Sequence, residues 1–116
     1  MKRVALAAVV LLGLCAFVRG EADASAKTGR EAARADIKAG RLVLRTYGFA
    51  YAGSTDYARL LKERLGVEIK SAGGCVVDAR IIGETNAYNE VMKAEIARRF
   101  GKDALEKIQA EAQRQR

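Results

Sequence analysis

The sequence contains no histidine, no proline and no tryptophan, and only two of its 116 residues are cysteine. Without histidine, Ser-His-Asp and Cys-His nucleophile systems are excluded, together with the commonest general base near neutral pH. Zinc sites that use imidazole are excluded for the same reason. The sequence therefore predicts no metal, no cofactor and no histidine-based enzyme.

Long apolar runs are also missing, with one exception at the N-terminus. Lys2 and Arg3 are followed by an uncharged, largely apolar segment, Val4–Val18. A short basic head before such a segment is typical of a secretory signal peptide, and the segment is shorter than the roughly 20 residues of a membrane span. We therefore expect export to the periplasm or the medium.

The expected cleavage site follows Ala24, because small residues occupy the positions that the signal peptidase recognises. Cleavage after Gly20 or Ala26 is an alternative, as is an uncleaved N-terminal anchor. Lipid attachment at Cys15 is a further alternative, although Leu14 fits poorly before a lipidated cysteine. The expected organisation is a signal peptide over residues 1–24, a partly helical leader over 25–40 and one domain over 41–116.

Acidic residues are fewer than basic ones. Losing residues 1–24 takes three basic and two acidic side chains from a net charge of +7, which leaves +6 on the exported part. Such a surplus favours acidic partners, such as an acidic protein, a small anionic ligand, or an anionic membrane or wall polymer. The charges are dispersed, as on an ordinary soluble surface, and an exported protein rarely meets nucleic acid, so no nucleic-acid partner is expected.

After cleavage Cys75 is the one remaining cysteine, so it has no internal disulfide partner. It follows two glycines and precedes Val76 and Val77, which suggests a strand that enters the core and buries the thiol. The alternatives are a disulfide with another molecule and a reactive thiol. The Cys-x-x-Cys motif that is usual in redox proteins of the thioredoxin type is not present. Cys75 is the one candidate for a thiol-dependent catalytic role.

A strand–helix–strand unit is predicted in the first half of the domain. Residues 41–49 are predicted to form a strand that is buried on both faces, because three consecutive apolar residues form its centre and do not alternate with polar ones. Residues 55–65 place leucines at helical spacing, Gly66 ends this helix, and residues 67–70 alternate like a half-exposed strand. Such a unit makes the two strands parallel. The leader helix is expected to begin near Glu31 and to pack weakly.

The second half is predicted to be mainly helical. Residues 75–79 are either a third short strand, which we favour, or the entry to a long helix. Because Gly83 interrupts the early part of the helical pattern, this helix is expected to begin near Glu84 or Thr85. An apolar stripe follows at helical spacing, made of Ile81, Tyr88, Met92, Ile96 and Phe100. A last helix over residues 103–113 turns Leu105 and Ile108 inward. The expected fold class is α/β, with a two- or three-stranded sheet under two or three helices.

The strongest candidate for a binding site is the connection between the first strand and the first helix of this unit. Ligands of open α/β sheets bind where strands end and helices begin, and free N–H groups there can hold an anion. The candidate ligand-binding residues are Tyr47, Gly48, Tyr51, Ser54 and Thr55. The alternative is a purely structural role, in which the aromatic residues pack and the hydroxyl caps the helix. This alternative is kept because no phosphate-loop or dinucleotide-binding pattern is present.

Several short segments resemble a group of small exported bacterial proteins that carry no assigned function. They are Tyr47–Gly48, Asp56–Glu68, Gly74–Val77, Tyr88–Met92 and Arg99–Gly101. The resemblance covers residues 41–110 and implies export and a compact α/β domain, but no activity or site residue. We expect a non-enzymatic binding module. The alternatives are a redox or enzymatic factor that uses Cys75, and a protein that dimerises over a sheet edge or over the stripe from Tyr88 to Phe100.

Overall fold

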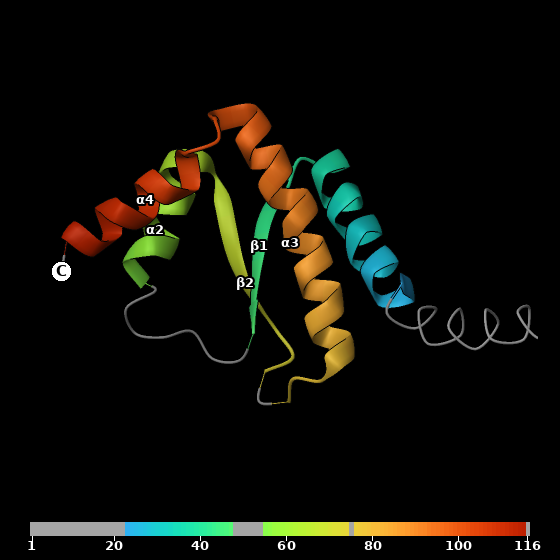
Figure 1. Cartoon of the computed structure of the whole chain (residues 1–116). Helices are drawn as coiled ribbons and strands as arrows, with labels where there is room; N and C mark the ends of the chain where they lie inside the picture. The colour runs from blue at the N-terminus through green and yellow to red at the C-terminus, as the bar shows by residue number, and fades with distance from the viewer. Residues whose placement is uncertain (1–22, 48–54, 75, 116) are drawn as a thin grey trace, which may run out of the picture.

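The structure is a computed structural model that describes residues 23–47, 55–74 and 76–115. In this part of the chain four helices accompany a two-stranded sheet, which confirms the α/β class. Residues 23–38 form a helix that we call the N-terminal helix (Figure 1). The elements that follow are β1 (Leu42–Tyr47), α2 (Thr55–Leu65), β2 (Val67–Ala72), α3 (Ala79–Phe100) and α4 (Ala104–Arg114). None of the described helices is long and apolar enough to cross a membrane.

The two strands are parallel, with Leu42 opposite Val67 and Tyr47 opposite Ala72. The predicted strand–helix–strand unit is therefore confirmed. Helix α2 ends at Gly66, whose φ of 69° lies in the left-handed region that glycine adopts without strain. This residue turns the chain directly from α2 into β2.

Successive side chains of a strand point to opposite faces, so the sheet has two distinct faces. Arg45 lies over the ring of Tyr88, at 3.8 Å from the ring centroid, which turns its face of β1 toward α3. Leu42 and Leu44 lie on the other face together with the fully buried Val67 of β2, which packs with α2. As predicted, β1 is buried on both faces.

The predicted third strand is wrong for the residues that the structure describes. Residues 76–78 have no regular structure, and Val76 is 73% exposed. Asp78 instead begins α3, because its carboxylate accepts a hydrogen bond of 2.8 Å from the Ile81 N–H. A helix cap therefore replaces the expected strand.

Helix α3 also begins earlier than predicted and runs through Gly83 without interruption. The stripe is confirmed at Tyr88, Met92 and Ile96, which are fully buried, whereas Phe100 is 43% exposed. Tyr88, Met92 and Ile96 pack within the chain, so a dimer would find only Phe100 of these residues exposed, and dimerisation over the stripe stays a prediction. The core takes up the middle of α3 and leaves its last turn in solvent.

The N-terminal helix packs against α3, which contradicts the prediction of a weakly packed leader. Ala33 is fully buried in the core, and Ile37 packs against it. The backbone of Gly29 lies so close to α3 that a Cβ there would come within 2.1 Å of the Glu84 carbonyl oxygen. The small side chains of Gly29 and Ala33 are what allow the two helices to approach.

Helix α4 covers α2, and its predicted inward residues are confirmed. Ile108 and Ala112 are buried and Leu105 is partly buried against the core. Arg64 of α2 forms an ion pair with Glu111 across the contact. Figure 1 shows α2 and α4 on one side of the sheet and α3 with the N-terminal helix on the other.

Candidate functional site

The predicted strand-to-helix site lies largely outside the described residues. Gly48, Tyr51 and Ser54 are not among them, and Thr55 is described only as the first residue of α2. Tyr47 is 40% exposed at the end of β1, and its hydroxyl donates a hydrogen bond to the side-chain oxygen of Asn86 on α3. This site remains a prediction, with Tyr47 held toward α3.

Cys75 also lies outside the described residues, so a role for its thiol remains a prediction. Its neighbours Val76 and Val77 are 73% and 37% exposed. The interpretation that these valines lead a strand into the core is therefore wrong. In the same region Glu84 accepts a 3.0 Å hydrogen bond from Arg80, which gives this carboxylate a structural partner.

A polar link joins the outer edge of β1 to α3. The Asn89 side-chain oxygen accepts a 2.8 Å hydrogen bond from the Arg45 N–H, and its amide nitrogen donates one of 2.7 Å to the Arg45 carbonyl oxygen. The side chain thus takes the place of a neighbouring strand. Because both peptide groups are satisfied, this link fixes the position of α3 along β1.

A second link joins the N-terminal helix to α3 and to Arg41, the residue before β1. The Tyr88 hydroxyl donates a 2.6 Å hydrogen bond to Asp36, whose other carboxylate oxygen accepts one of 2.9 Å from Arg41. These bonds hold the pKa of the Asp36 carboxyl below its usual value, whereas burial and the nearby carboxylate raise the pKa of Tyr88. Both groups keep their charge states near neutral pH, which indicates a structural link rather than an acid–base pair.

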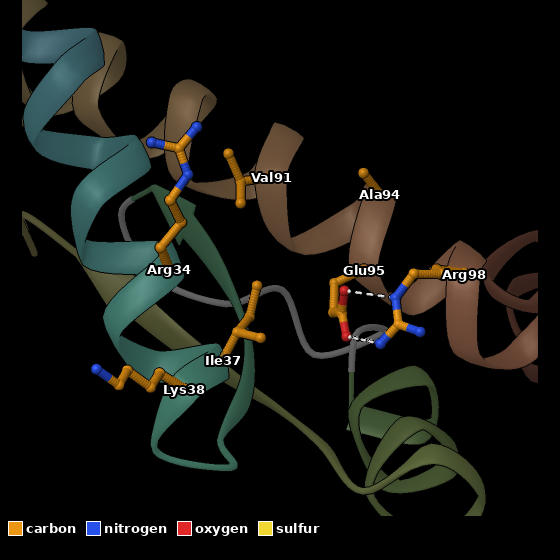
Figure 2. A pocket seen from close by; sticks show the side chains of 7 residues that line it. All are labelled: Arg34, Ile37, Lys38, Val91, Ala94, Glu95 and Arg98. Carbon is orange, nitrogen blue, oxygen red and sulfur yellow. Dashed lines mark hydrogen bonds and ion pairs between the residues drawn. The ribbon is translucent and has the colours of Figure 1, made fainter.

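The best candidate for a binding site is a groove of about 490 Å³ between the N-terminal helix and α3 (Figure 2). We call it the basic groove. Apolar side chains of both helices, Ile37, Val91 and Ala94, form its floor. The charged side chains that line it are Arg34, Lys38, Glu95 and Arg98.

The single acidic side chain of the basic groove is neutralised by its own helix. Glu95 accepts hydrogen bonds from Arg98 at 2.6 Å and from Arg99 at 2.7 Å. These bonds lower the pKa of Glu95 to about 2, so it stays ionised and is a very weak base at neutral pH. Arg34 and Lys38 form no ion pair with any described residue, and the groove is therefore positive overall.

The cations of the groove continue as a row along the N-terminal helix. Arg30, Arg34 and Lys38 are spaced by four residues, which places them on one face of the helix. Like charges at this spacing destabilise an isolated helix by about 0.2–0.5 kcal/mol per pair. Lys38 ends the helix, where a cation interacts favourably with the helix dipole, so the row has effects of both signs on helix stability. Its place beside the groove makes it a candidate surface for an anionic partner.

A second hollow, of about 520 Å³, lies between α2, α3 and α4. Tyr57, Ile96 and Leu105 give it an apolar wall, while Lys93, Lys102 and Glu106 bring charges of both signs to its lining. Burial raises the pKa of the Tyr57 phenol, so this side chain stays neutral. The mixed charges give the hollow no clear ligand preference.

No protein-family model, no curated protein and no solved structure matches the chain. The described residues also hold no group of three or more histidine, cysteine, aspartate or glutamate side chains that could bind a metal ion. The resemblance to small exported proteins therefore remains a prediction. The charge and the apolar lining of the basic groove are the basis for the proposed function.

The basic groove was not predicted from the sequence, although one signal was available. Three cations at four-residue spacing in an alanine-rich helix mark a charged face. That this face borders a groove depends on the close approach of α3, a helix far away in the sequence, which Gly29 and Ala33 of the N-terminal helix make possible. The prediction of weak packing for the leader concealed this possibility.

Proposed function

We propose that this protein is a non-enzymatic binding module that holds an acidic segment of a partner protein in the basic groove. The observation that carries the proposal is the combination of an apolar floor with the two cations, Arg34 and Lys38, that have no acidic partner among the described residues. A segment with alternating apolar and acidic side chains would satisfy both. The charge of the whole chain, +7, would speed its approach.

The chemistry of the lining supports binding rather than catalysis. The groove residues offer no thiol, hydroxyl or imidazole, and the carboxylate of Glu95 is occupied by two arginine side chains. A nucleophile with an adjacent base, which covalent catalysis needs, is therefore missing from this lining.

A protein segment can use both the apolar and the charged side chains of the groove. Ile37 and Val91 are partly exposed between the two helices, beside the exposed Arg34 and Lys38. A peptide can insert apolar side chains between the helices while its carboxylates pair with the rim.

Fluorescence anisotropy with a labelled peptide of alternating glutamate and leucine tests the proposal. We expect Arg34→Glu with Lys38→Glu to weaken binding at least about tenfold, because two attractive charges become repulsive. A peptide of alternating lysine and leucine should not bind.

The matched control changes the same amount of charge at a distance. Lys107→Glu with Arg114→Glu alters two exposed cations of α4, outside the groove. This variant should bind within about threefold of the wild type at 0.15 M salt, where screening limits long-range effects. Equal weakening by both variants, or binding of anionic lipid vesicles but not of the peptide, would overturn the proposal.

A further inference from the structure

The outer edge of β2 is oriented by the hydrogen bonds of β1. Both peptide groups of Arg45 bond to Asn89, so they point away from β2. Peptide groups of successive residues alternate in direction, and therefore those of Leu44 point toward β2. With Leu44 opposite Ile69, the parallel pattern directs the peptide groups of Glu68 and Lys70 inward and those of Ile69 outward.

No other described strand pairs with this edge, since the sheet consists of β1 and β2. The face of β2 turned away from α2 is also exposed at Glu68 and Lys70. At Ile69 no described strand lies beside this edge, and such an edge is a template for another strand. The occupant that we infer follows from the charges along the strand.

We propose that β2 pairs antiparallel with β2 of a second copy of this chain, about a two-fold axis at Ile69. The result is one four-stranded sheet with the two β1 strands outermost. At the axis Ile69 lies opposite Ile69 of the partner subunit, and the two residues exchange their outward N–H and C=O groups. This proposal is independent of the basic groove.

The charge pattern selects this register. With the axis at Ile69, Glu68 lies opposite Lys70 of the partner subunit, and Lys70 lies opposite Glu68 of the partner subunit. These are pairs without ladder hydrogen bonds between them, where side chains approach most closely. An axis at Glu68 would oppose two glutamates, and an axis at Lys70 would oppose two lysines. One register is therefore favoured and its neighbours are opposed.

The interface is small and joins two positively charged copies, so we expect a weak dimer. Within one copy the side-chain nitrogen of Lys62 on α2 already lies 2.7 Å from a carboxylate oxygen of Glu68. In the dimer Glu68 would accept from Lys62 and from Lys70 of the partner subunit together. This arrangement screens the repulsion between the two copies at the point of contact.

Charge exchange tests the proposal by sedimentation equilibrium. The protein is used as the producing cell processes it, with reductant present so that Cys75 forms no link between copies. Wild type should dimerise with rising concentration. Glu68→Lys and Lys70→Glu should each self-associate at least about tenfold more weakly, because both cross-strand pairs become repulsive.

Mixing the two variants is the decisive arm. Lysines at both positions in one copy would face glutamates at both positions in the other, so the mixture should form a heterodimer. Both positions are exposed, and thermal unfolding checks that each variant is folded. A wild type that stays monomeric at every concentration overturns the proposal, as does a mixture of folded variants that forms no dimer, or variants that dimerise as well as wild type.

Discussion

The two strands of the sheet have the same length and opposite surroundings. Three successive residues of β1 are buried, and Asn89 closes its outer edge at Arg45. In β2 Val67 is the only fully buried residue, while Glu68, Lys70 and Ser71 are exposed, and no described strand pairs with its outer edge. The difference shows that α3 and the N-terminal helix protect one half of this small sheet and leave the other half available for contacts.

Truncation of one apolar side chain on each strand should give the largest difference between them. Leu44→Ala removes a side chain that is 7% exposed, and should lower the free energy of unfolding by about 2–5 kcal/mol. Ile69→Ala, at a half-buried position, should cost about 1 kcal/mol. Urea unfolding measures both, and equal losses would show that β2 is as enclosed as β1.

The packing beside β1 can be tested at two glycines of the contacting helices. Gly29→Ala should destabilise by about 1–3 kcal/mol, because the new methyl group meets the carbonyl of Glu84. Gly83→Ala meets nothing closer than 3.4 Å and should stabilise α3 by about 0.5–1 kcal/mol. Thermal unfolding that finds Gly29→Ala harmless would contradict the close approach of the N-terminal helix.

The edge of β1 can be opened by removing its amide link. Asn89→Ala leaves the Arg45 peptide groups without their partner and should cost about 1–3 kcal/mol. Asn86→Ala is the matched control one turn earlier. It loses an exposed hydrogen bond to Tyr47 and should cost less than about 1 kcal/mol in the same denaturant titration. Similar losses for the two variants would remove the special role of Asn89.

Acid should weaken the contact between the N-terminal helix and α3. The hydrogen bond from Tyr88 and the contact with Arg41 lower the pKa of Asp36 in the folded protein. The unfolded chain therefore binds a proton more readily, so the contribution of Asp36 is present above its ordinary pKa near 4 and is lost as the pH falls through the folded value.

Asp36→Asn tests this pH dependence directly. The variant should be less stable than wild type near pH 7, and the difference should shrink as the pH falls through the lowered pKa of Asp36, where the wild-type carboxylate takes up its proton. The pH-dependent contributions of groups that both proteins contain, such as Glu95, cancel in the difference between their free energies of unfolding. A difference that stays constant over this range would show that the charge of Asp36 contributes nothing.

The elements that the sequence predicted well are those with a local pattern. The apolar run of β1, the leucine spacing of α2 and the turn at Gly66 each specify their structure within a few residues. The parallel pairing of β1 with β2 follows from their order along the chain. Local rules are sufficient there because neighbouring residues make the deciding contacts.

The errors concern positions that distant residues decide. Gly83 was expected to interrupt α3, but the contact with the N-terminal helix accompanies an unbroken helix. Phe100 continues the apolar spacing of the stripe yet extends beyond the core. The basic groove exists because Gly29 and Ala33 let two helices approach, and no local pattern records that contact.

The most direct test of the contrast between the two strands is backbone amide exchange at Arg45 and Ile69, measured over a range of protein concentrations. We expect the Arg45 amide to be protected at every concentration, because Asn89 holds it within the chain. The Ile69 amide should exchange quickly in dilute solution and more slowly as the concentration rises. An Ile69 amide that is equally protected at all concentrations would show that the edge of β2 is closed within one copy. An Arg45 amide that exchanges freely would show that Asn89 does not close the edge of β1.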